Sequence, residues 1–108
     1  WYYERLKDSE FCLYHEKADN EAVHHLFVIT HTDRNMIQEK LQSKGIPSGI
    51  HYPVPIHKHK CFADESFARN AFFPHSERQG KELLSLPMHP NLTEIEVDQI
   101  CESLLSKK

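Results

Sequence analysis

The sequence predicts an α+β fold, in which helices pack on a small sheet. Three observations lead to this prediction. Residues Val23 to Thr30 are rich in β-branched and aromatic side chains, as expected for a strand. Residues 93–105 carry apolar side chains at helical spacing. Between these two segments, strand-like and helix-like stretches alternate within a chain of 108 residues, which is the length of one compact domain.

The first third of the chain is expected to hold the end of a helix and two strands. Trp1 to Leu6 fits the last turns of a helix, and Phe11 to Tyr14 fits a short strand. A polar break at residues 19–21 precedes the strongest predicted strand, Val23 to Thr30. The unbroken apolar run from Leu26 to Ile29 predicts that this strand is buried on both faces.

A helix is expected after this strand. Thr32 or Asp33 can cap its N-terminus, and Gly45 can end it, because glycine tolerates the left-handed conformation found at helix C-termini. The apolar side of this helix is expected to consist of Met36, Ile37 and Leu41.

Two prolines dominate the middle of the chain. Ile46 to Tyr52 is expected to be extended. Pro53 and Pro55 each fix φ and lack an N–H donor, so neither a helix nor a central strand continues through them. We therefore expect residues 51–57 to form a rigid extended loop, with a helical turn somewhere in residues 58–71.

A short helix is expected next. Pro74 suits a first helical position, and Ser76 with Gln79 matches a capping box. Leu83 and Leu84 are expected to form the apolar side of this helix.

The chain is expected to end in an amphipathic helix. Residues 86–88 are expected to be extended, and Thr93 with Glu96 matches a second capping box. After this box, apolar residues recur at positions i, i+3, i+4, i+7 and i+8, which places them on one side of a helix. These residues are Val97, Ile100, Cys101, Leu104 and Leu105.

Composition and charge argue against several classes of protein. The formal net charge is -3 and the two signs are interspersed, so the chain lacks the basic stripe of a nucleic-acid-binding protein. The longest apolar run is far too short to span a bilayer. Three widely spaced cysteines indicate a reducing compartment rather than a disulfide framework, and we expect a cytoplasmic protein.

The loop of residues 51–57 is the main candidate for a functional site. Two prolines reduce the conformational entropy of the loop, so the side chains of His51, Tyr52 and His57 are held in place. These groups offer hydrogen-bond donors and acceptors near neutral pH, as the wall of a ligand site requires. The competing interpretation is a structural turn with its histidines in solvent.

Other side chains are weaker candidates. His51, His57, His59 and Cys61 are suitable zinc ligands, but they lack a paired short spacing such as Cys-x-x-Cys. His24 and His25 begin the buried strand and are expected to be structural. The cysteines show no activating arrangement strong enough to predict a catalytic thiol, and Cys101 is expected in the core.

Three segments, in order, resemble a known family. Residues Gly49 to His57, which read Gly-Ile-His-Tyr-Pro-Val-Pro-Ile-His, are similar to the signature segment in the C-terminal domain of the DegT/DnrJ/EryC1/StrS aminotransferases. His25 to Ile29, followed by a helix and the step Lys44-Gly45-Ile46, resembles the central strand region of that domain. Leu84 to Pro90, followed by Leu92-Thr93 and a terminal helix, resembles its closing segment. The resemblance covers nearly the whole chain.

The resemblance implies a function for the parent protein. Members have the fold-type I architecture of pyridoxal-phosphate enzymes, so we expect a small, mostly antiparallel sheet like that of their C-terminal domain. They are homodimers that mostly transfer an amino group, commonly from glutamate, to a nucleotide-linked keto sugar. By this resemblance His51, Tyr52 and His57 would line the substrate side of the site and contact sugar or phosphate groups.

The resemblance also implies what this chain does not supply. The Schiff-base lysine lies in the family's large cofactor-binding domain, and no lysine here lies in the corresponding motif. We therefore expect residues 1–108 to be one C-terminal small domain, which binds no pyridoxal phosphate and is inactive alone. The start at Trp1-Tyr2-Tyr3, without an initiator Met, is expected to mark excision from a longer chain. The alternative function is an independent His-rich, zinc-binding interaction module.

Overall fold

The computed structural model describes residues 1–106 and contains a three-stranded sheet with helices on it. The strands are β1 (Cys12–Leu13), β2 (Phe27–Thr30) and β3 (Leu83–Leu86). They lie in the order β1-β2-β3, and both pairs are antiparallel. This arrangement confirms the expected α+β class and the expected antiparallel sheet.

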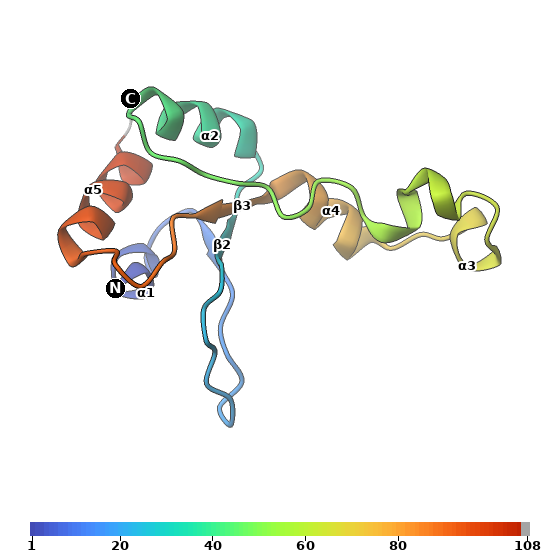
Figure 1. The fold of residues 1–108 in the computed structure, drawn as a ribbon, viewed down its shortest axis with the longest axis horizontal. Coiled ribbons are helices and arrows are strands. Elements are labelled where there is room, and N and C mark those ends of the chain that lie inside the picture. The colour runs from blue at the N-terminus through green and yellow to red at the C-terminus, as the bar shows by residue number, and fades with distance from the viewer. Residues whose placement is uncertain (107–108) are drawn as a thin grey trace.

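The helices form two groups. Three of them, α1 (Tyr2–Leu6), α2 (Arg34–Ser43) and α5 (Glu94–Leu105), lie together on one side of the sheet (Figure 1). The others lie along an extension that projects away from the sheet. They are α3 (Ser66–Arg69), α4 (Pro74–Glu82) and two 3-10 turns, η1 (Ile56–Lys58) and η2 (Lys60–Phe62).

The shape of the chain is open rather than spherical. Its radius of gyration is 15.9 Å, whereas a compact domain of this length has a radius of about 13 Å. Figure 1 shows two projections from the sheet: the α3–α4 extension and the hairpin between β1 and β2. We call residues 51–82 the arm, and the sheet with α1, α2 and α5 the body.

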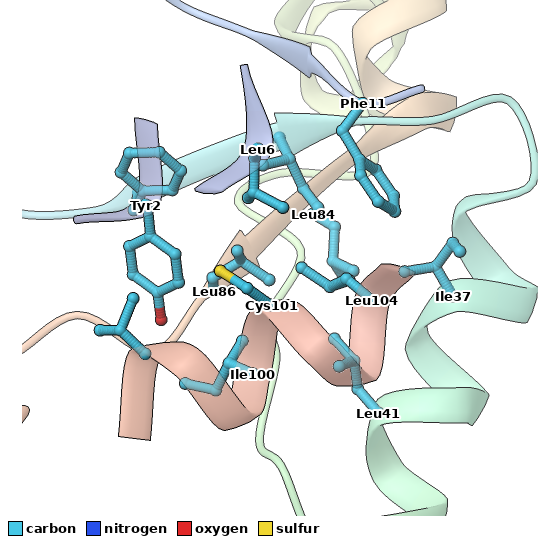
Figure 2. Packing of buried hydrophobic residues seen from close by; sticks show 13 residues of the cluster. Tyr2, Leu6, Phe11, Ile37, Leu41, Leu84, Leu86, Ile100, Cys101 and Leu104 are labelled. Carbon is cyan, nitrogen blue, oxygen red and sulfur yellow. The ribbon is translucent and has the colours of Figure 1, made fainter. Parts of the chain in front are cut away.

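The body contains one apolar core. Its buried side chains come from α1, α2, α5, β2 and β3, with Phe11 just before β1, and Figure 2 shows Leu84, Leu41 and Leu104 pointing toward one another. The side chains of Leu104 and Leu84 are each 1% exposed. Helix α5 packs against both α1 and α2, so it closes the core on the side opposite the strands.

Polar contacts fix the two ends of α5. The predicted capping box is present: Thr93 Oγ accepts the Glu96 amide at 3.3 Å, and the Glu96 carboxylate accepts the Thr93 amide at 2.8 Å. The Thr93 amide and the Thr93 hydroxyl both donate to the Glu96 carboxylate and lower its pKa below the ordinary value. Near the C-terminus, Lys40 Nζ donates to the Leu104 carbonyl at 3.1 Å. This bond satisfies a carbonyl that the helix leaves open and places a cation at the negative end of the helix dipole.

Helix α1 is attached to α5 by an ion-pair cluster. Arg5 donates to Glu94 at 2.7 Å and also pairs with Asp98, one turn further along α5. Both bonds raise the pKa of the Arg5 guanidinium above its ordinary value. Below this cluster, Tyr2 stacks on Phe27 with a centroid distance of 4.6 Å, and burial raises the pKa of the Tyr2 phenol.

The structure corrects several expectations about the elements. The strand predicted from Val23 starts only at Phe27, because His24 has a left-handed φ of 47° and Val23 is 95% exposed. On one face of the observed strand Phe27 and Ile29 are buried, whereas on the other Thr30 is buried and Val28 is half-buried. The prediction of burial on both faces therefore holds only in part. The predicted extended segment 46–52 meets the sheet only at Gly49, which forms a bridge with Ser85.

Two helices also differ from the predictions. Met36 of α2 is 51% exposed, whereas Ile37 and Leu41 are buried as expected. Helix α4 begins at Pro74, so Phe73 is its N-cap and the predicted Ser76–Gln79 capping box does not form. Leu83 and Leu84 do not belong to α4 at all. They lie in β3, because α4 ends at Glu82 and Leu84 then pairs with Ile29 of β2.

The predicted start of α4 and the predicted end of α2 are confirmed. Pro74 is the first residue of α4, and Gly45 follows α2 with a φ of +72°. At that φ a side chain would strain the backbone, so glycine fits the end of α2. Among residues 1–106, no helix combines the length and the apolar character needed to cross a bilayer.

Candidate functional site

The candidate site lies where the proline loop crosses the free edge of β3. Gly49 exchanges two backbone hydrogen bonds with Ser85, at 3.0 and 2.7 Å. The chain then turns away from the sheet at His51 and Tyr52, whose peptide bond is cis, and runs along α4 through Pro53 and Pro55. The sheet therefore holds one end of the loop and α4 holds the rest.

Two cavities lie beside this loop. One has a volume of about 490 Å³ and is lined mainly by arm residues, including Tyr52, His57, Phe67 and Phe73. The other has a volume of about 400 Å³ and lies between the loop and the β1–β2 hairpin. His51, Gln79 and Leu83 line both cavities. The lining of the second cavity also includes the tyrosine, histidine and glutamate side chains Tyr3, Tyr14, His15, His24 and Glu16.

His51 is held by the sheet. Its Nδ1 lies 3.0 Å from the hydroxyl of Ser85, which is buried. A Cβ added at Gly49 would lie 2.6 Å from the His51 ring, so the ring folds back over a position that only glycine leaves free. The His51 ring meets the Tyr52 ring edge-on, with centroids 5.6 Å apart.

Tyr52 and His57 have opposite environments. Tyr52 is 73% exposed, and its side chain lines the larger cavity. The His57 side chain is only 5% exposed, and its Nε2 lies 3.1 Å from a Glu77 carboxylate oxygen of α4. The ring of Phe73 covers His57 edge-on, with centroids 4.9 Å apart. His57 therefore lines the cavity from within the wall, whereas Tyr52 projects from it.

Glu77 and Gly80 of α4 complete the wall, and the sequence analysis missed both. The hydrogen bond from His57, supported by the Lys58 ammonium at 3.5 Å, holds the pKa of Glu77 below its ordinary value. Gly80 is buried against the loop, since a Cβ there would lie 2.8 Å from the Pro53 carbonyl oxygen. A glycine inside a helix can indicate that another backbone segment packs closely against that helix, and Gly80 offered this signal in the sequence.

The residues predicted as alternative zinc ligands point to different partners. His51 faces Ser85, His57 faces Glu77, and His59 Nε2 lies 3.1 Å from the Val54 carbonyl oxygen. Cys61 is exposed. Within residues 1–106, no group of three or more His, Cys, Asp or Glu side chains could hold a metal ion together.

Comparisons with known proteins identify the family of this chain. The model of the DegT/DnrJ/EryC1/StrS aminotransferase family matches residues 1–105. The chain belongs to this family. It is 33% identical over 104 residues to the dTDP-3-amino-3,6-dideoxy-alpha-D-galactopyranose transaminase of Aneurinibacillus thermoaerophilus, covering 96% of this chain and 28% of that protein.

Two further relatives agree. The chain is 31% identical over 88 residues to the UDP-2-acetamido-2-deoxy-3-oxo-D-glucuronate aminotransferase of Pseudomonas aeruginosa, covering 82% of this chain and 23% of that protein. It superposes on the crystal structure of a DegT DnrJ EryC1 StrS aminotransferase from Brucella abortus with a TM-score of 0.86 and 34% identity, covering 95% of this chain and 27% of that one. The chain thus spans about a quarter of the length of these relatives.

The residues beside the loop do not by themselves make a site for pyridoxal phosphate, the cofactor of this family. A Schiff base requires a lysine amine next to the bound aldehyde. The residues that line the two cavities at the loop include no lysine. The loop offers the Tyr52 phenol and the imidazoles of His51 and His57, and α4 adds the Gln79 amide. Groups of these kinds bind and orient polar ligands.

Proposed function

We propose that this chain is the C-terminal small domain of a pyridoxal-phosphate-dependent aminotransferase that acts on a nucleotide-linked keto sugar. Family membership supports the class of reaction, and the named relatives are nucleotide-sugar aminotransferases. The observation that carries the proposal is the loop of residues 51–57, which holds the exposed Tyr52 phenol at the larger cavity and His51 at both cavities. The His-rich zinc-binding alternative is not favoured, because its histidines face separate partners.

The proposed roles of this chain are binding and orientation. The Tyr52 hydroxyl and the free ring nitrogen of His51 can form hydrogen bonds to sugar hydroxyl or phosphate oxygens, and His57 lines the same cavity from within its wall. Holding the sugar at a fixed place relative to the reacting group lowers the entropic part of the barrier. The cofactor, its lysine and the amino donor glutamate would bind to the large domain of the same polypeptide, in a homodimer.

The domain assignment has a direct test. The isolated chain of residues 1–108 and the full-length protein that carries it are each mixed with pyridoxal phosphate, and absorbance in the visible region is recorded. The full-length protein is expected to form an internal aldimine and to transfer an amino group from glutamate. The isolated chain is expected to do neither, and a stable aldimine in the isolated chain would contradict the proposal.

The role of the loop is tested by substitution in the full-length protein. Tyr52→Ala removes an exposed phenol from the cavity wall. It is expected to raise the KM for the keto sugar about tenfold, because the loss of one hydrogen bond to a charged group weakens binding by about that factor. Ile95→Ala is the control, because Ile95 is equally exposed at 70% and lies on α5, outside both cavities. Equal KM values in the two variants would remove Tyr52 from the site.

A further inference from the structure

One face of α4 carries two groups that contact the proline loop. Glu77 and Gly80 are three residues apart, so they lie on the same side of the helix. Glu77 meets the loop at His57 and Lys58, with distances of 3.1 and 3.5 Å. Gly80 meets it at Pro53, where a Cβ would lie 2.8 Å from the carbonyl oxygen. The two contacts hold both ends of the segment 53–58 against a single helix.

The contact with Glu77 determines that the Nε2 atom of the His57 ring carries a proton. An ionised carboxylate only accepts hydrogen bonds, so His57 Nε2 must carry the proton that it donates to Glu77. The imidazole is almost fully buried, and Phe73 covers it. Within residues 1–106, no buried side-chain nitrogen or oxygen lacks a hydrogen-bond partner. Without Glu77, this buried donor would lose its partner or move toward solvent and carry the loop with it.

The path from this contact to Tyr52 is short and stiff. His57 lies in the 3-10 turn η1, where the Lys58 amide donates to the Pro55 carbonyl at 2.9 Å. Pro53 and Pro55 restrict the backbone between this turn and Tyr52. A displacement at His57 is therefore transmitted along the loop to Tyr52 rather than absorbed within it.

We infer that Glu77 is a positioning residue for the substrate-side loop: through His57 it fixes where the exposed Tyr52 stands in the cavity, without touching substrate itself. The substrate-binding role of the loop rests on the proposed function, whereas the control of loop position by Glu77 does not. A purely structural role in α4 would change the stability of the protein and leave the loop and the substrate affinity as they are.

The test compares three variants of the full-length protein that carries this chain. Glu77→Ala removes the acceptor, and Glu77→Gln keeps a neutral acceptor. Glu82→Gln is the matched control, because Glu82 lies on the same helix and pairs with Arg78 of α4 rather than with the loop. Hydrogen exchange of the peptide 54–60 is followed by mass spectrometry, since the Lys58 and His59 amides donate within this turn. Steady-state kinetics then gives KM for the keto sugar and kcat.

Glu77→Ala is expected to speed exchange in this peptide by roughly three- to tenfold, with Glu77→Gln in between and Glu82→Gln equal to wild type. KM for the sugar is expected to rise by a similar factor, with a smaller change in kcat. Should Glu77→Ala fail to fold, Glu77→Gln against Glu82→Gln makes the same comparison.

The outcomes separate this inference from the proposed function. Exchange that is unchanged in the Glu77 variants, or equally fast in Glu82→Gln, overturns the inference whether or not the protein is an aminotransferase. A wild-type protein that transfers no amino group, but whose loop loosens only in the Glu77 variants, overturns the proposed function and keeps the positioning role. An active protein whose loop loosens without any change in KM contradicts the link from loop position to substrate binding.

Discussion

The body and the arm of this chain are built by different means. In the body, thirteen apolar side chains form one buried cluster, and helix α5 carries a complete capping box. In the arm, Phe67, Phe72 and Ile56 are exposed, and none of α3, η1 and η2 has a side-chain cap. Burial of apolar surface holds the body together, whereas single polar contacts and two prolines hold the arm.

The exposed apolar side chains are the feature that distinguishes the arm from the body. Large apolar side chains that gather on an exposed extension are typical of a surface that takes part in an interaction. The body buries a cluster of apolar side chains, whereas the arm exposes several of its own. This difference between body and arm is consistent with the proposed function. In that proposal the body holds the arm in place, and the arm forms one wall of a site shared with the large domain.

The largest expected effect tests the body. Leu104 and Leu105 are neighbours on α5, but Leu104 is buried and Leu105 is half-exposed. Leu104→Ala is expected to lower the free energy of unfolding by about 2–5 kcal/mol, because it leaves a cavity in the core. Leu105→Ala is expected to lower it by less than about 1 kcal/mol. Denaturant unfolding checks both, and similar losses would show that the core is not packed as Figure 2 draws it.

Thiol reactivity separates the core of the body from its surface and from the arm. Cys101 lies in the core, and burial raises the pKa of its thiol from 9.0 to about 11. At pH 8 this shift lowers the thiolate fraction about 100-fold, before any effect of access. In the isolated chain, a disulfide reagent is therefore expected to label the exposed Cys12 and Cys61 rapidly and Cys101 only on unfolding. Three equally fast thiols would contradict a closed body.

Much of the body could be predicted from the sequence, because local pattern and packing agree there. The capping box at Thr93, the glycine after α2 and the buried face of α5 follow from spacing alone, except that Leu105, which was expected on this face, is half-exposed. The errors arise where a distant contact decides. Leu83 and Leu84 have good helix propensity, but pairing with β2 makes them a strand.

The candidate site could be predicted only in part. The two prolines and their polar neighbours identify the loop, and the place of His51 and Tyr52 beside the cavities followed from it. Glu77 could not be found in this way, because its partner His57 lies 20 residues earlier in the chain. Only the packing of α4 along the loop brings the two together. The same packing places the His57 ring inside the wall, which no local pattern indicates.

A smaller effect concerns the capping of α5. Thr93→Ala is expected to lower the free energy of unfolding by about 1 kcal/mol, because the Glu96 amide loses its acceptor. Thr32→Ala is the control, since Thr32 is exposed and precedes α2 without forming its cap. Thermal unfolding measures both, and equal shifts in melting temperature would contradict the capping box.

The pH dependence of the same cap has a defined sign. The bonds from Thr93 depress the pKa of Glu96 in the folded state, so the unfolded state binds its proton first as pH falls. The stabilisation is therefore complete above the ordinary value of 4.5 and disappears as pH drops through the lower folded pKa. The difference in melting temperature between wild type and Glu96→Gln is expected to be constant near neutral pH and to vanish in acid.

The smallest expected effect tests the arm. Phe72 is 76% exposed next to the start of α4. In the isolated chain, Phe72→Ser is expected to change the free energy of unfolding by no more than about 0.5 kcal/mol, since it removes no buried contact. In the full-length protein the same change is expected to cost more, because a covered arm would bury that ring. Equal and small losses in both would show that Phe72 stays in solvent, and a large loss in the isolated chain would show that the arm shares the core of the body.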